Sequence, residues 1–136
     1  MTTTIFDSRT LVSSESFEKV VRYVAREHYV HPRDARRIVE QALAFTQLCA
    51  ENRGRRLAAP EDVSLGHWAL ILHTEVYAEL CARLGGFLHY EPVSLGQQNA
   101  DEVQETAALM RRAGLPVDED LWNPEGSSFR DAGDCG

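Results

Sequence analysis

The chain has 136 residues, of which 43% are hydrophobic and 26% are charged, and its formal net charge at pH 7 is −7. Such a length and composition are typical of one globular domain with a single hydrophobic core. The excess of acidic residues disfavours binding to nucleic acid or to an anionic membrane surface, and no apolar run approaches the ~20 residues that cross a bilayer, so we predict neither partner.

The first part of the chain predicts two helices. Residues 1–13 lack the basic region and the apolar core of a signal peptide, so we expect an N-terminal extension on a cytoplasmic protein. Apolar residues at helical spacing predict a first helix from Ser14 to Tyr29. Pro32 suits the first position of a second helix, which we expect to end near Asn52. The basic cluster Arg53-Gly54-Arg55-Arg56 that follows is interpreted as a solvated loop.

The third predicted helix carries most of the chemically reactive side chains. It begins near Pro60 and is expected to continue without interruption to the double glycine at Gly85 and Gly86. Apolar residues cover most of its circumference, which is typical of a helix in the middle of a bundle. The segment from Phe87 to Pro92 is expected to follow in extended or irregular form.

The last part of the chain predicts one more long helix and a short one. Asn99 is a capping residue with an acid three positions later, and Gly114 marks the end of that helix. Residues 117–122 are expected to form one further turn, and residues 125–136 a flexible acidic tail. Because no stretch alternates as a β-strand does, we predict an all-α domain at residues 14–124. We expect an orthogonal or irregular bundle of four to five helices.

The third helix and the segment after it share a spaced run of aromatic, histidine and cysteine residues: His67, Trp68, Ile71, Leu72, Thr74, Tyr77 and Cys81, then Gly86, Phe87, Leu88, His89 and Pro92. This run resembles the signature of the glycine-rich-domain-containing-protein-like family, and the resemblance covers roughly residues 30–124. The chain departs from that signature with Ser64 in place of an aspartate, His67-Trp68 in inverted order, and Tyr90 in place of a second histidine. The resemblance implies a small helical domain and identifies no reaction.

Eight side chains of this region form the candidate site. Imidazole and phenol groups exchange protons, so acid–base roles are assigned to His67, His89, Tyr77 and Tyr90. Ligand-binding roles are assigned to Trp68, His73, Cys81 and Phe87. His89 is the first choice among the histidines, because loops carry functional residues more often than buried helices do.

No cofactor is predicted. Histidine and cysteine are Zn and Cu ligands, but no pair in this chain has a compact metal-ligand spacing. On an unbroken helix His67 and Cys81 would stand roughly 21 Å apart, at ~1.5 Å per residue. One ion could not bind both, so a Zn or Cu site would need His89 together with one end of the helix.

Three hypotheses from different classes follow. The first is a binding or accessory protein, with a role in specialised metabolism, whose His/Tyr-containing loop after Gly85 meets a small molecule or a protein partner. The second is a small tailoring enzyme that uses histidine and tyrosine in acid–base or metal-assisted chemistry. The third is a scaffold whose C-terminal tail, with Cys135, is itself modified. The first is favoured, because the sequence contains no recognised catalytic set.

Overall fold

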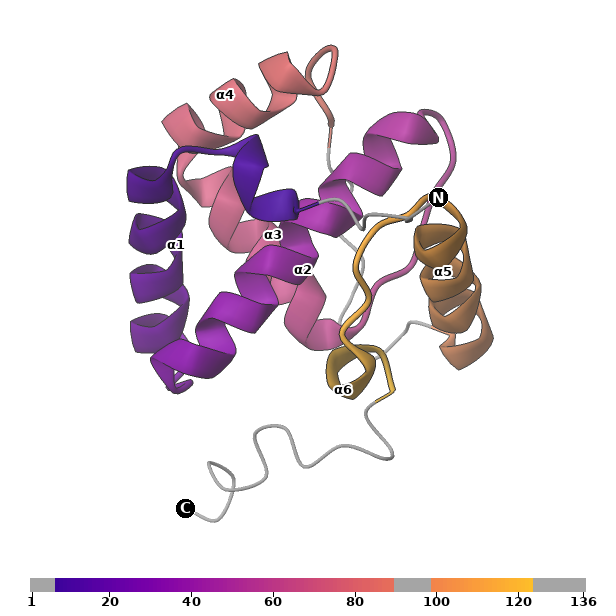
Figure 1. The fold of residues 1–136 in the computed structure, drawn as a ribbon, viewed down its shortest axis with the longest axis horizontal. Helices are drawn as coiled ribbons and strands as arrows, with labels where there is room; N and C mark the ends of the chain where they lie inside the picture. The colour runs from indigo at the N-terminus through magenta and orange to yellow at the C-terminus, as the bar shows by residue number, and fades with distance from the viewer. Residues whose placement is uncertain (1–6, 90–98, 124–136) are drawn as a thin grey trace, which may run out of the picture.

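Helices and their connections make up all of the chain that the computed structural model describes, which is residues 7–89 and 99–123 (Figure 1). A short 3-10 helix, η1 (Ser8–Leu11), comes first. The α-helices are α1 (Ser14–Glu27), α2 (Pro32–Glu51), α3 (Glu61–Leu72), α4 (Thr74–Arg83), α5 (Ala100–Arg112) and α6 (Glu119–Trp122). The predicted all-α class is confirmed. The number of α-helices within the described ranges is six instead of four to five.

Helix α2 is the centre of the fold. In Figure 1 it runs through the middle of the molecule, between α1 on one side and α5 on the other, and α3 passes behind it. Half of its residues are buried, and it packs against η1, α1, α3 and α5. Pro32 occupies its first turn, and the His31 side chain caps it by accepting a hydrogen bond from the Arg33 backbone N–H. The long apolar stripe of this sequence segment is therefore the surface around which the other helices gather.

The predicted single helix from Pro60 to Gly85 is wrong in one respect, because it is broken at His73. The backbone of His73 leaves the helical region with φ −86° and ψ 78°, which ends α3 and begins α4. The His73 backbone N–H and the His73 Nδ1 both approach the Ala69 carbonyl oxygen, at 3.2 and 2.7 Å. A side chain that shares its helical acceptor with its own backbone competes with continued helix formation. The chain then changes direction between Leu72 and Thr74.

Helix ends match the predicted signals closely. Ser13, one residue before the predicted cap, accepts a hydrogen bond from the Ser16 N–H and starts α1. The Asn99 side chain accepts one from the Asp101 N–H and starts α5. Gly85 has φ +95°, a left-handed conformation that glycine adopts without strain, and it follows the end of α4 as predicted.

The helical domain begins before the predicted boundary at residue 14. Leu11 and Val12 are buried, and the Ser8 hydroxyl donates a hydrogen bond of 2.9 Å to the Glu40 carbonyl of α2. Residues 8–12 of the predicted extension therefore belong to the core. None of the described helices combines the length and apolar character that crossing a membrane requires. The predicted tail at residues 125–136 lies outside the described residues.

Candidate functional site

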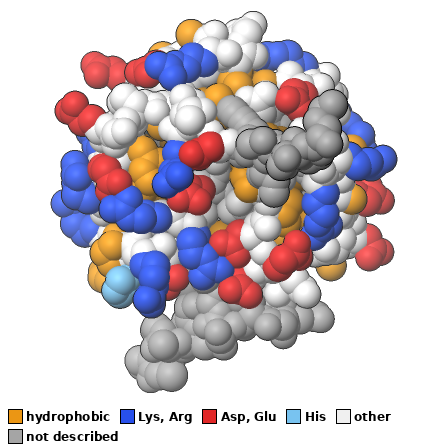
Figure 2. Space-filling view, in the orientation of Figure 1, with side chains coloured by type: hydrophobic (Ala, Val, Ile, Leu, Met, Phe, Trp, Pro, Cys, Tyr) orange, Lys and Arg blue, Asp and Glu red, His pale blue; other side chains and the backbone are white. Residues whose placement is uncertain are grey.

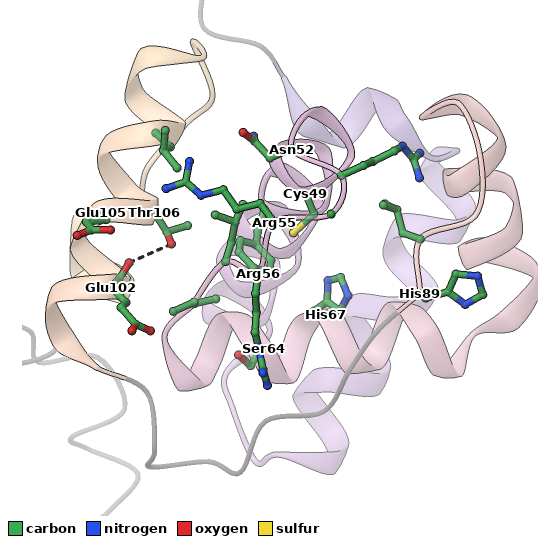
Figure 3. A pocket seen from close by; sticks show the side chains of 18 of the residues that line it. Cys49, Asn52, Arg55, Arg56, Ser64, His67, His89, Glu102, Glu105 and Thr106 are labelled. Atoms are coloured by element: carbon green, nitrogen blue, oxygen red, sulfur yellow. Dashed lines mark hydrogen bonds between the residues drawn. The ribbon is translucent and has the colours of Figure 1, made fainter.

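A pocket of about 940 Å³ lies between α2, the loop after it, α3, the segment that follows α4, and α5 (Figure 3). The loop is residues 52–60 and the segment after α4 is residues 84–89. Among the predicted site residues, His67, Tyr77, Phe87 and His89 line the pocket. The break at His73 makes this possible. On a straight helix His67 and Tyr77 would stand about 15 Å apart, whereas their ring centroids lie 6.2 Å apart.

A continuous series of aromatic and histidine rings runs along the pocket and beyond it to Trp122. Phe45 of α2 contacts Trp122 and His67, with centroid distances of 6.4 and 5.8 Å. Tyr77 meets the Phe87 ring at 5.6 Å, edge to face, and Phe87 meets His89 at 4.8 Å. Edge-to-face contacts at these distances are favourable and resist rotation of the rings. The series runs from the fully buried Trp122 to the exposed His89 and gives the pocket a stiff aromatic side.

The imidazole of His67 is held in one orientation inside the protein. Its side chain is 5% exposed, and its Nδ1 lies 3.1 Å from the Thr46 hydroxyl oxygen. That hydroxyl has a single hydrogen, which it donates to the Ala42 carbonyl at 2.7 Å. The network therefore assigns the proton to Nδ1 and leaves Nε2 as an acceptor. Burial lowers the pKa of His67 to about 4, so the ring is neutral at pH 7.

The phenol of Tyr77 is hydrogen-bonded to the segment after α4. Its hydroxyl donates a hydrogen bond of 2.6 Å to the Leu88 carbonyl. Burial, and to a smaller extent the neighbouring Cys81, raises the pKa of Tyr77 above its usual value. Burial also raises the pKa of Cys49 to about 12, so this half-buried thiol of the pocket wall stays protonated at pH 7. Both groups are neutral, and the Tyr77 proton is already engaged.

Arg53 ties the loop after α2 to the segment after α4. Its guanidinium donates hydrogen bonds to the carbonyls of Leu84, Gly86 and Phe87, at 3.1, 3.0 and 3.2 Å. These carbonyls follow the end of α4, where backbone acceptors have no helical partner. Arg53 and Tyr77 thus hold the same short segment from two sides. The sequence shows the basic cluster at residues 53–56 but not that it faces the end of α4, so the prediction of a solvated loop misses these contacts of Arg53.

Two further residues of that cluster line the pocket. The side chains of Arg55 and Arg56 project from the loop in different directions, Arg55 toward α5 and Arg56 toward Ser64 of α3 (Figure 3). The turn that presents them is fixed, because the Asn52 side chain donates to the Leu48 carbonyl and the Arg55 N–H donates to the Asn52 carbonyl. Gly54 has φ +86°, which makes glycine the suitable residue for this turn. Both arginines are exposed, as predicted, but they form one side of a pocket.

Among the described residues, Trp68, His73 and Cys81 do not line this pocket, and His89 lines only its edge. His89 is exposed at the edge of the pocket, and Figure 3 shows its ring directed away from His67, with two aromatic rings between them. Trp68 is half-buried and His73 lies at the helix break, where it borders a smaller hollow of about 580 Å³. Cys81 is buried behind Tyr77. Tyr90 lies outside the described residues.

No protein-family model matches the chain, and neither the curated proteins nor the solved structures compared with it give a match. The resemblance to the glycine-rich-domain-containing-protein-like family therefore stays a prediction.

Within residues 7–89 and 99–123, no three His, Cys, Asp or Glu side chains are grouped as metal ligands are. His67 is directed to the Thr46 hydroxyl and His89 lies at the far edge. The arrangement is suited to holding an organic molecule against an aromatic surface, with arginines on one side and polar groups of α3 and α5 around it.

Proposed function

We propose that this protein binds a small organic molecule in the pocket between α2, α3 and α5. The observation that carries the proposal is the pocket itself. Its volume of about 940 Å³ lies within the range of small-molecule sites, which is roughly 300–1,000 Å³. Its lining combines apolar side chains such as Phe45, Phe87 and Leu109 with a few polar groups, which is the usual composition of such sites.

The same residues favour binding over catalysis. General acid–base catalysis needs a proton donor and an acceptor within reach of one substrate. The Tyr77 hydroxyl hydrogen is donated to the Leu88 carbonyl, and His67 and His89 are separated by two rings. Among the described residues, the Tyr77 proton is therefore not directed to a ligand, and His67 and His89 do not meet at a common point, whereas the aromatic surface that these rings form is continuous.

A protein partner is the less supported of the two predicted partner types. Among the described residues, the large hydrophobic side chains that are most exposed are Tyr29, Leu72 and Phe87, and they come from three different turns of the chain. On the face that Figure 2 shows, hydrophobic side chains are interspersed with acidic and basic ones. Isolated exposed hydrophobic residues are normal, whereas protein interfaces show contiguous apolar patches. Phe87 lines the pocket, and this position accounts for the exposure of its side chain.

The test is a nuclear magnetic resonance screen of aromatic fragments with the full chain. We expect binding fragments to shift the amide signals of Cys49, His67 and Phe87. Leu109→Trp, which fills the pocket from α5, should abolish binding, while Leu72→Trp, at a 63% exposed site outside the pocket, should not. A screen in which no fragment binds, or in which the shifts gather at the smaller hollow beside His73, would contradict the proposal.

A tailoring enzyme remains the second candidate because of one observation, the neutral imidazole of His67 in the lining of the pocket. If the bound compound is converted, His67→Gln should abolish turnover and leave binding in place. Unchanged turnover in that variant would remove His67 as the base. The scaffold hypothesis concerns Cys135, which lies outside the described residues, and a role in specialised metabolism stays a prediction.

A further inference from the structure

We infer that the ligand of this pocket is a carboxylic acid with an apolar, ring-sized body, and that its carboxylate binds on the side of the pocket that Arg55 and Arg56 form. The inference rests on the proposed small-molecule function and deepens it. It is carried by three observations: two unpaired guanidinium groups on this side of the pocket, the charge balance of the lining, and the aromatic part of the lining.

The first observation concerns the partners of the arginines. Most arginines of α1 to α5 have acidic partners, as Arg37 has in Asp118 at 2.7 Å. Among the described residues the guanidinium groups of Arg55 and Arg56 take part in no ion pair and no hydrogen bond. Guanidinium binds carboxylate with two parallel hydrogen bonds, and it is weakly hydrated, so it gives up water readily for such a partner. The loop presents two such groups to the pocket, in different directions (Figure 3).

The second observation is the charge balance. Arg53, Arg55 and Arg56 line the pocket together with Glu102 and Glu105 of α5, and no ion pair joins the two groups. The arginines outnumber the glutamates by one, and His67 is neutral at pH 7. A single negative charge balances this lining. A second negative charge would meet the α5 carboxylates, and a polyanion would also meet the overall charge of −7. These charges select a carboxylate over a phosphate ester.

The third observation is the surface that would receive the rest of the ligand. Phe45 and Phe87 both line the pocket, and each belongs to the ring series that Tyr77 and His67 complete. Aromatic faces bind flat apolar bodies with good contact area and little loss of side-chain freedom. A ligand whose carboxylate binds on the arginine side of the pocket would place its body on these rings.

The test uses a matched probe set built on one naphthalene ring system: 2-naphthoate, 2-naphthamide, 2-naphthylmethylamine and 2-naphthyl phosphate. Each is titrated into the full chain and its dissociation constant is measured. We expect 2-naphthoate to bind about tenfold more tightly than 2-naphthamide, because one carboxylate on partly exposed arginines contributes about one decade of affinity. The double variant Arg55→Gln/Arg56→Gln should remove this difference and leave the affinity for 2-naphthamide unchanged.

The control is Arg33→Gln/Arg112→Gln, which removes the same charge from two exposed arginines outside the pocket. It should keep the tenfold difference. Equal binding of 2-naphthoate and 2-naphthamide, tighter binding of the amine, or tighter binding of the phosphate would overturn the carboxylate assignment while the proposed function stands. Failure of all four probes to bind would count against the proposed function itself.

Discussion

The buried imidazole of His67 makes the stability of the fold depend on pH. Burial lowers the pKa of His67 to about 4 in the native state, whereas an unfolded chain has a histidine pKa near ~6.5. Between these values the unfolded chain binds more protons, so the free energy of unfolding falls as the pH decreases. Above about pH 6.5 the ring is neutral in both states and contributes no pH dependence. The contribution of His67 to the free energy of unfolding therefore changes between pH 4 and about 6.5.

We predict that the wild type loses about 2–3 kcal/mol through His67 between about pH 7.5 and about pH 4.5. The measurement is the free energy of unfolding in urea at both pH values. His67→Gln should lack this part of the loss. His28→Gln, which removes a histidine outside the pocket, should show the same loss as the wild type. Equal pH dependence of the wild type and His67→Gln would show that the ring is not held neutral by the fold.

The sequence pattern points to four side chains that line the pocket, but it does not give their orientation. His67, Tyr77, Phe87 and His89 were selected from one stretch of sequence, and all four line the pocket. Thr46, which sets the tautomer of His67, lies 21 residues earlier on α2 and carries no motif. Its pairing with His67 depends on how α2 and α3 cross, and helical period alone does not determine a crossing.

The segment from Leu84 to His89 depends on two anchors, Arg53 and Tyr77. Arg53 donates to three of its carbonyls, and Tyr77 donates to a fourth, that of Leu88. We predict that Arg53→Gln and Tyr77→Phe each cost about 1 kcal/mol of unfolding free energy. Because both hold the same short segment, the double variant should deviate from the sum of the two by at least about 0.5 kcal/mol.

Amide hydrogen exchange of Gly86 and Phe87 provides a local measurement of the same effect. Exchange should accelerate in each single variant and most in the double variant. The controls are Arg56→Gln and Tyr23→Phe, whose side chains make no hydrogen bond among the described residues. Strict additivity, together with unchanged exchange at Gly86, would mean that the segment is held by its packing alone.

The crossing of α2 and α3 depends on the absence of a side chain at Gly66. A Cβ atom there would lie 2.8 Å from the Ile38 side chain and 3.0 Å from the Ile38 carbonyl oxygen. Ile38 is 1% exposed and its backbone is part of α2, so neither contact can relax easily. We predict that Gly66→Ala destabilises by about 1–3 kcal/mol, although alanine favours helix elsewhere. Gly66→Ser should lose more unfolding free energy than Gly66→Ala. Denaturant unfolding measures both, and a Gly66→Ala variant as stable as the wild type would refute the close approach.

The break at His73 shows what periodicity can and cannot predict for an element. The apolar pattern from Val63 to Leu80 indicated a buried helix, and the buried residues of α3 and α4 bear this out. The pattern contains no Pro or Gly at residue 73, so no breaking signal was visible. The break follows from the His73 side chain, which shares the Ala69 carbonyl and meets the Tyr23 ring of α1 at 5.1 Å. It is this tertiary contact that the sequence pattern could not supply.

At the scale of the whole molecule, contacts with α2 hold the segment around α6 against the rest of the bundle. Arg37 donates to Asp118 at 2.7 Å and to Asp120 at 2.9 Å. One turn later, Gln41 accepts hydrogen bonds from the Asp118 N–H and from the Trp122 indole, at 3.1 and 2.8 Å. Trp122 then touches Phe45, which lines the pocket. Trp122 is fully buried, so it holds this turn against the bundle.

The amide oxygen of Gln41 accepts both of the hydrogen bonds that join α2 to the Asp118 backbone and the Trp122 indole. Gln41→Ala leaves two donors near Trp122 without that acceptor, and each buried donor without a partner costs about 1–3 kcal/mol. We therefore expect a loss of about 2–4 kcal/mol, with the Trp122 emission shifted to longer wavelength in a Trp68→Phe background. Gln47→Ala, which removes a surface hydrogen bond to Glu51 on the same helix, should change stability by less than about 0.5 kcal/mol. Gln41→Met restores the volume without the acceptor, so it should be nearly as unstable as Gln41→Ala. A Gln41→Met variant with wild-type stability would show that packing, and not the hydrogen bonds, holds α6 against α2.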